Sequence, residues 1–324
     1  MELGVSAAAG IDVDLRTLRT GARQQAVTEY ILGLADRAGY RAALIDAALI
    51  AADPSAPLGT WHSLASGGTD PSVMTWSQFA HTVRAAVRGL SRRGLRESDT
   101  VGIFVHDAVR HVVAVHAVRA AGALAAPVRP APVRLSPTTA DAAGDVAGDI
   151  AGDIAAQLKG CRARLLITSA ALAELAVEAA ERSCVRQVFA FGEAEGTTPF
   201  GSLLHAAKHG QAQPADRAGQ DGGAGRDGAD GPGTARMPDL AWFGLDGPVP
   251  RLTSRDVVVA APPCGDPDAY TSLLDLVLAA GATLVAAPLS QVGAAAVAYK
   301  GTAAIVPRGT DVPGLDPGRI LAVG

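Results

Sequence analysis

Aromatic residues are scarce in this sequence: they make up 4% of its 324 residues, whereas hydrophobic residues as a whole make up 48%. The apolar residues are therefore mainly Ala, Val and Leu, which suit helices that pack on a buried parallel sheet. Their number is sufficient for a substantial core. The length fits one large α/β domain or two domains of ordinary size.

Positive charge and cysteine are also in short supply. The formal net charge is −4, so no general attraction to nucleic acid or to an anionic membrane is expected. The cysteines are Cys161, Cys184 and Cys264. Because none stands in a C-x-x-C pair and their number is odd, the sequence predicts neither a disulfide framework nor a zinc knuckle.

Long apolar runs are missing, since no window reaches 18 uninterrupted apolar residues. The stretch VVAVHAVRAAGALAAPV is interrupted by His116 and Arg119. The first residues, MELGVSAAAGIDVDLRTLRT, carry early acids and no apolar segment of signal-peptide length, so a cytoplasmic protein is expected. The richness in Ala, Arg and Gly is typical of high-GC actinobacterial coding sequences.

Short apolar runs alternate with segments of helical periodicity along most of the chain. A helix is predicted over Glu29–Ala52, and an apolar stripe from Phe79 to Leu90 predicts another, which Gly94 ends. The segments DTVGIFV, DAVRHVVAVHAVRAAG and ALAAPV follow as a β-α-β unit with Asp107 as N-cap. Thr168 or Ser169 is expected to cap the helix after ARLLITS.

Further strands are expected at ARLLITS, RQVFAFG, DLAWFG, RDVVVAAP, ATLVAAP, GTAAIVP and GRILAVG, with helices between several of them. This alternation predicts an α/β, mostly parallel, three-layer fold. The expected divisions are a loose N-terminal arm over 1–25, a first α/β half over 26–212 and a second half over 239–324. A Gly- and Asp-rich loop over 213–238 separates the halves, because seven of the fifteen residues from Gly219 to Gly233 are Gly.

No metal site is predicted. Three aspartates four residues apart, from Asp145 to Asp153, would share one helix face and could form an acidic metal-binding stripe. A solvated face is favoured, because the glycines between them weaken that helix by roughly 1 kcal/mol each. His106, His111 and His116 are spaced by five residues, so each is rotated by about 140° from the last and the three cannot converge on one ion.

The stretch from Thr75 to Pro130 resembles the opening of the adenylate-forming superfamily, which contains acyl-CoA synthetases, 4-coumarate–CoA ligases and peptide-synthetase adenylation domains. TWSQF resembles the family's opening motif, GLRESDTV its turn into the first strand, and AVRAAGALAAPVRP a helix-to-strand passage. The resemblance continues in the same order through DIAAQLKGCRARLLITS, DVVVAAPPCGDPDAYTSLLDLVLAAGATLVAAP and GTAAIVPRGTDVPGLDPGRILAVG. It implies a fold like the front part of the family's N-terminal domain.

The sequence departs from the family where ATP is handled. The family's Gly-rich loop, whose backbone N–H groups and lysine cradle phosphates, has no counterpart in the ten residues between DLAWFG and RDVVV. In the family a histidine commonly stands at the edge of the acyl pocket, and here Gly265 or Asp266 stands near that place. The family's ribose-binding aspartate and its C-terminal domain with the catalytic lysine would follow Gly324. The resemblance therefore implies a truncated, degenerate member.

These departures predict a non-adenylating relative that uses no cofactor and binds an acyl- or CoA-type ligand or a partner protein in acyl or aryl acid biosynthesis. The alternative is a repurposed enzyme, or half of a split ligase completed by a partner chain. A homodimer or a heterocomplex with a biosynthetic partner is expected, because a sheet that ends at GRILAVG leaves an uncovered edge. Neither nucleic acid nor membrane is expected as a partner.

The candidate ligand-pocket residues are Cys264, Asp266, Tyr270 and Trp242, and no catalytic residue is predicted. Cys264 follows the carboxyl end of a predicted strand, where open α/β sheets place ligands. The competing interpretation is a turn with an incidental cysteine, in which Asp268 caps the next helix. The interpretation as a turn is favoured. Trp242 is expected in the core of its strand, or as cover for the vacated phosphate site.

Overall fold

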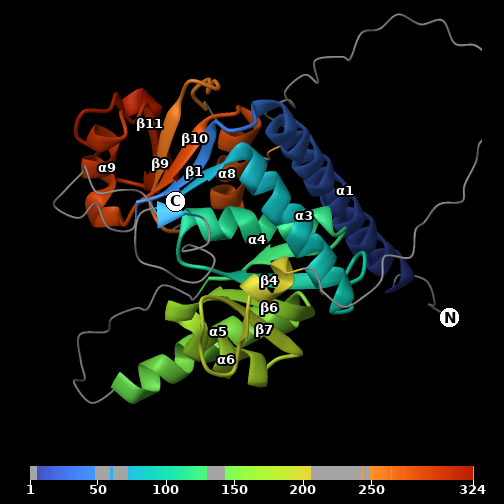
Figure 1. The fold of residues 1–324 in the computed structure, drawn as a ribbon. Coiled ribbons are helices and arrows are strands. Elements are labelled where there is room, and N and C mark those ends of the chain that lie inside the picture. The colour runs from blue at the N-terminus through green and yellow to red at the C-terminus, as the bar shows by residue number, and fades with distance from the viewer. Residues whose placement is uncertain are drawn as a thin grey trace, which may run out of the picture.

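The computed structural model describes residues 6–47, 59–60, 72–129, 143–205, 243, 249–263 and 265–323. These residues form two sheets that share a layer of helices (Figure 1). The expected loop over 213–238 lies outside the described residues, and so do Trp242, Cys264 and all of DLAWFG except Phe243. In the described part of the chain, no helix is both long and apolar enough to cross a membrane.

The smaller sheet has the strand order β5-β4-β6-β7-β8, and all neighbouring strands in it are parallel. Its strands are β4 (Thr100–Phe104), β5 (Leu124–Pro127), β6 (Ala163–Ser169), β7 (Gln187–Phe191) and β8 (Thr198–Pro199). The helices that belong to this part are α4 (Ala108–Ala120), α5 (Ala143–Gly160), α6 (Ala173–Glu181) and α7 (Gly201–Leu204), with a 3₁₀ turn at Ala170–Leu172. Strands β4 to β7 stand where the sequence predicts them.

The larger sheet has the order β12-β11-β9-β10-β1-β3-β2, and only β1 and β3 are antiparallel neighbours in it. Its strands are β1 (Ala42–Asp46), β2 (Gly59–Thr60), β3 (Ser72–Thr75), β9 (Val257–Ala260), β10 (Thr283–Ala286), β11 (Ala303–Pro307) and β12 (Ile320–Val323). The helices around it are α1 (Ser6–Ala38), α3 (Trp76–Arg92), α8 (Pro267–Ala279) and α9 (Val292–Ala298), with 3₁₀ turns at Leu289–Gln291 and Pro317–Arg319.

Successive strand residues face different layers, which gives three cores. Val258 of β9 and Ile103 of β4 face the central core, where α1, α3, α4 and α8 lie between the sheets (Figure 1). Val259 faces α9 on the outer side of the larger sheet, and Leu166 of β6 faces α5 and α6 on the outer side of the smaller one. The predicted α/β, mostly parallel class is confirmed, but the chain forms two sheets that share a helix layer where one three-layer sheet was expected.

The N-terminal predictions need correction. Helix α1 occupies Ser6–Ala38, where a loose arm was expected over residues 1–25, and it ends at Gly39, whose φ of 60° belongs to the left-handed region. The predicted helix over Glu29–Ala52 is therefore wrong between Gly39 and Ala47, because Ala42–Asp46 forms β1; residues 48–52 lie outside the described residues. A short apolar run such as AALID fits a buried strand as well as a helix, and its neighbours β10 and β3 decide the outcome.

The expected halves do not coincide with the sheets. Strands β1 to β3, which belong to the first half of the sequence, join β9 to β12 of the second half in the larger sheet. The chain thus enters the larger sheet, builds the smaller sheet, and returns. Because β1 lies between β3 and β10, the first described strand is internal rather than peripheral.

Two helix starts show how local sequence sets the caps. Thr75 and Gln78 of TWSQF form a capping box: Thr75 Oγ1 accepts from Gln78 N at 3.2 Å, and Gln78 Oε1 accepts from Thr75 N at 2.8 Å. Asp107 caps α4 as predicted, since its Oδ1 accepts from Arg110 N at 2.7 Å. Ser169 precedes the 3₁₀ turn without a side-chain capping bond, and its hydroxyl instead contacts His106 Nδ1 at 2.7 Å.

Helix α4 is buried along its whole length from Ala108 to Arg119, so its polar side chains need partners inside the protein. His116 Nδ1 lies 2.9 Å from Thr28 Oγ1 of α1, and its Nε2 lies 3.4 Å from Asp275 Oδ1 of α8. His111 Nε2 lies 2.9 Å from Thr271 Oγ1, also of α8. These contacts join α1, α4 and α8 through the middle of the molecule.

The ion pair between Arg119 and Asp275 ends this buried network. Arg119 Nη1 donates to Asp275 Oδ2 at 2.6 Å, with 5% and 9% of the two side chains exposed. Burial lowers the pKa of His116 well below its ordinary value, and the positive charge of Arg119 adds to that effect. Burial, again with Arg119, lowers the pKa of His111 to about 4. Both imidazoles are therefore neutral at pH 7.

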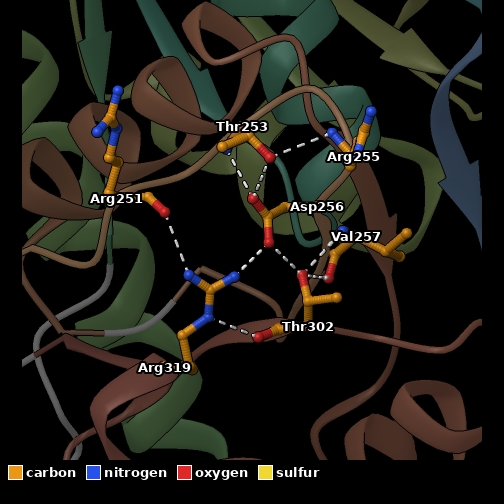
Figure 2. Close-up of polar contacts among 7 residues, drawn as sticks. All are labelled: Arg251, Thr253, Arg255, Asp256, Val257, Thr302 and Arg319. Carbon is orange, nitrogen blue, oxygen red and sulfur yellow. Dashed lines mark hydrogen bonds and ion pairs between the residues drawn. The ribbon is translucent and has the colours of Figure 1, made fainter.

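Asp256 links the amino ends of three neighbouring strands of the larger sheet (Figure 2). Its carboxylate accepts hydrogen bonds from Thr253 N at 2.7 Å and from Thr302 Oγ1 at 2.7 Å, and it pairs with the guanidinium of Arg319. Arg319 also donates to the carbonyls of Thr302 and Arg251, at 3.0 and 3.2 Å. Burial opposes ionisation, but these donors outweigh it and hold the pKa of Asp256 below its ordinary value.

Replacing Asp256 by Asn should lower the free energy of unfolding by about 2 kcal/mol, because charge-assisted hydrogen bonds to Arg319, Thr302 and Thr253 are weakened. Urea unfolding at pH 7 measures the loss. The matched control is Asp311→Asn, which removes the same charge from an exposed position and should change the free energy of unfolding by less than about 0.5 kcal/mol. Equal effects of the two substitutions would contradict a structural role for the Asp256 cluster.

Acidification should destabilise the fold in the range between pH 6.5 and 4. The unfolded chain binds protons at the ordinary histidine pKa of 6.5, whereas folded His111 does so only at about 4, so stability is complete above pH 6.5 and falls as the pH drops below it. Each buried histidine should contribute about 1 kcal/mol to the loss between pH 7 and 5.5. Urea unfolding at both pH values measures it.

The substitution His111→Gln should reduce this pH dependence, since glutamine does not titrate. The control is His81→Gln, which removes an exposed imidazole of α3 and should leave the pH dependence unchanged. An identical loss of stability in His111→Gln and in the parent protein would show that His111 is not responsible.

Candidate functional site

A wide cleft of about 840 Å³ opens beside the buried network. Its walls come from α1, β5, the end of α5, the first half of α8 and Phe243. The apolar part of the lining includes Val27, Leu124, Pro127 and Ala269. A cleft of this size, lined by apolar side chains with a few polar groups, is typical of small-molecule sites.

The polar groups of the cleft are of both signs. Three arginines, Arg23, Arg119 and Arg162, line it from α1, α4 and the turn after α5. Arg119 is held by Asp275, which also lines the cleft. Arg162 is exposed and has a φ of 54°, a left-handed conformation that is uncommon for a residue with a Cβ atom.

The N-terminus of α8 contributes two carboxylates to the same cleft. Asp266 is the N-cap, and its Oδ1 accepts from Asp268 N at 3.2 Å. The cap is thus Asp266 rather than Asp268, as Pro267 occupies the first turn. Burial raises the pKa of Asp268 and the neighbouring charge of Asp266 raises it further, whereas Arg119 opposes both. This end of the cleft is therefore unfavourable for a strongly anionic group.

Two of the four predicted pocket residues, Asp266 and Tyr270, lie in the described part of the chain, and only the first lines the cleft. Asp266 lines the cleft. Tyr270 is completely buried; its hydroxyl donates to the Ala261 carbonyl at 2.7 Å and its ring meets that of His111 edge to face. Tyr270 thus contacts the core and does not line the wide cleft. Cys264 and Trp242 lie outside the described residues.

A second, smaller cavity of about 130 Å³ lies at the carboxyl ends of β1, β9 and β10. It is lined there by Asp46, Ala260 and Ala286, and on the opposite side by His106 and Asp107 at the start of α4. The carboxyl ends of parallel strands are where open α/β sheets place ligands. Its volume admits only a small group, so the wide cleft is the better candidate for an acyl or aryl ligand.

The three histidines spaced by five residues have different partners. His106 contacts Ser169, His111 contacts Thr271, and His116 contacts Thr28 and Asp275. Among the described residues, no group of three or more His, Cys, Asp or Glu side chains is arranged to hold a metal ion.

Sequence reasoning missed most of the residues that line the cleft. One signal was present: His116 and Arg119 interrupt the otherwise apolar stretch VVAVHAVRAAGALAAPV, and a charge at such a position requires a buried partner. Arg23 and Arg162 carry no comparable signal, because arginines on a polar helix and in a turn are ordinary surface residues. Their common location in one cleft follows only from the tertiary structure.

The chain resembles known proteins both in sequence and in fold. The family model for AMP-binding enzymes matches residues 59–221, which is half of the chain. A benzoate CoA ligase from Burkholderia xenovorans shares the fold with a TM-score of 0.55 and 16% identity, over 91% of this chain and 54% of that chain. No curated protein matches the chain.

Two further solved structures share the fold. A long-chain-fatty-acid-CoA ligase from Archaeoglobus fulgidus matches with a TM-score of 0.53 and 15% identity, over 87% of this chain and 51% of that chain. The amide bond synthetase McbA from Marinactinospora thermotolerans matches with a TM-score of 0.53 and 14% identity, over 92% and 53%. The chain spans about half the length of these structures. The family match and the shared fold confirm the resemblance seen in the sequence: this chain belongs to the family of AMP-binding, adenylate-forming enzymes.

Proposed function

We propose that this chain is a non-adenylating relative of the acyl- and aryl-CoA ligases, and that it binds an acyl or aryl acid, or its CoA thioester, in the wide cleft. The observation that carries the proposal is a roomy, partly apolar cleft in a chain whose sequence has only ten residues where the family's phosphate loop and the helix after it would stand. In this proposal the ligand-binding scaffold is retained and the nucleotide chemistry is lost.

The charges of the cleft support this division. The phosphates of ATP need several N–H donors and cations around them. Here Asp266 and Asp268 occupy the helix N-terminus that would otherwise attract phosphate. A single carboxylate or thioester group needs fewer donors, and in this proposal Arg162, an exposed residue of the cleft lining, supplies one.

A biosynthetic partner protein or a second copy of the chain is the other part of the proposal. Among the described strands, β12 pairs with β11 alone, so one of its edges is available for pairing. The alternative function is a repurposed enzyme, or half of a split ligase completed by a partner chain. Light scattering of the purified chain distinguishes self-association from dependence on a partner.

The chain alone should show no ATP–pyrophosphate exchange above background with any carboxylic acid, because its sequence lacks the phosphate loop. A panel of aliphatic and aromatic acids tests this, with an intact acyl-CoA ligase as positive control. Exchange by the clean chain would refute the non-adenylating proposal. Exchange that appears only after a second polypeptide is added would favour the split-ligase alternative.

Ligand binding should depend on the cleft. Calorimetric titration with benzoate, benzoyl-CoA, octanoyl-CoA and free CoA separates the acyl group from the CoA group as the recognised part. Arg162→Gln should weaken binding of the preferred ligand about tenfold, because one charged hydrogen bond is lost. The control Arg88→Gln removes the same charge from an exposed position on α3 and should leave affinity unchanged. Absence of binding by all four ligands would refute the ligand-binding proposal.

A further inference from the structure

Two of the three cysteines lie together, although nothing in their sequence spacing indicates it. Cys161 directly follows α5, and Cys184 follows the C-cap of α6. The Sγ atom of Cys161 lies 3.6 Å from the carbonyl oxygen of Leu158, and that of Cys184 lies 3.9 Å from the same oxygen. Both thiols are free. Since they share one acceptor, their sulfur atoms are neighbours.

The backbone keeps the two residues close. Cys161 leads into β6 and Cys184 leads into β7, which are adjacent parallel strands. Just after the cysteines, Arg186 N donates to the carbonyl of Arg164 at 2.8 Å. Adjacent strands are about 4.8 Å apart, and disulfides join residues whose Cα atoms are about 4.4–6.8 Å apart. The cysteines lie just before this pairing begins, so the two strands bring them near each other, and their common contact with the Leu158 carbonyl shows that the side chains point to one place.

The end of α5 explains why both thiols point at one oxygen. The carbonyls of the last helical turn lack backbone donors from within the helix. Arg162 N donates to Lys159 O at 3.0 Å, so it does not continue the helical pattern to Leu158 O. The two S–H groups donate there instead. In the reduced protein this shared acceptor keeps the sulfur atoms side by side.

The two thiols differ in their surroundings. Cys184 is exposed, whereas Cys161 is partly buried and lines the wide cleft. Burial raises the pKa of the Cys161 thiol, and the nearby Cys184 raises it further. Accessibility makes Cys184 the thiol that a dissolved oxidant reaches first, and a second thiol beside it can resolve the oxidised form.

We propose that Cys161 and Cys184 form a reversible disulfide when the protein meets a peroxide. The thiolate of Cys184 attacks one peroxide oxygen, the O–O bond breaks, and a sulfenic acid and hydroxide form. The thiolate of Cys161 then attacks the Cys184 sulfur and displaces the second hydroxide. The two thiols lose two electrons and two protons, and hydrogen peroxide is reduced to two molecules of water.

The bond has a local structural consequence. It joins the end of α5 to the end of α6 and restrains the turn that carries Arg162 into the cleft. Oxidation therefore couples the redox state of the protein to the wall of the cleft. It should also raise Tm by roughly 5 °C or more, because the crosslink restricts the unfolded chain.

Peptide mass spectrometry after treatment with hydrogen peroxide and alkylation with N-ethylmaleimide tests the proposal. Trypsin cleaves after Lys159, Arg162, Arg182 and Arg186. The expected product joins the peptide Gly160–Arg162 to the peptide Ser183–Arg186, with a mass two hydrogens below that of the separate peptides. Dithiothreitol should restore both free peptides and reverse the rise in Tm.

Single variants identify the order of the steps. In Cys161→Ser the sulfenic acid of Cys184 should persist and react with dimedone, whereas Cys184→Ser should give neither a dimedone adduct nor a crosslink. Cys264→Ser is the control and should form the crosslink like the parent protein. A linkage through Cys264, or oxidation of Cys184 to the sulfinic acid without a linked peptide, would overturn the proposal.

Discussion

Helix α4 lies between the two sheets, and every residue from Ala108 to Arg119 is buried there. Its charged and polar side chains cannot reach bulk water, so the surrounding elements must supply their partners. Asp275 and Thr271 of α8 and Thr28 of α1 do so. The positions of α1 and α8 around α4 thus depend on a polar network as well as on apolar packing. Removing one member of such a network leaves a buried charge or dipole without its partner, which is costlier than removing both.

The same network shapes the candidate site. Arg119 and Asp275 line the cleft, and they also hold α4 to α8. The charge of this part of the cleft is consequently fixed by the requirements of the core. Arg162, in the turn after α5, lines the same cleft without belonging to this network.

In the larger sheet, the amino ends of the strands are joined by side-chain hydrogen bonds, whereas a cavity lies at the carboxyl ends. At the amino ends of β9, β11 and β12, Asp256 and Arg319 connect strand to strand (Figure 2). At the carboxyl ends of β1, β9 and β10 lies a small cavity that faces the start of α4. Hydrogen bonds at the amino ends stabilise the order of the strands, while the carboxyl ends are free to form cavities, as in other open parallel sheets.

Short sequence patterns determined several helices and strands by themselves. The strands β4, β6, β7 and β9 follow from short apolar runs, the start of α3 from the capping box of Thr75 and Gln78, and the start of α4 from Asp107. The family was recognisable for the same reason, because its motifs are ordered along the chain. The missing phosphate loop is likewise a property of the sequence alone.

Tertiary structure decided whatever depends on residues far apart in the chain. Ala42–Asp46 is a strand only because β3 and β10 flank it, and through these pairings the larger sheet joins strands from early and late parts of the sequence. Asp266 and Arg162 share a cleft, and Cys161 and Cys184 share an acceptor, through contacts between helices and strands that sequence spacing does not encode. The periodicity of apolar residues shows which face of a helix or strand is buried, but not which other element packs against that face. These sites form where two such elements meet.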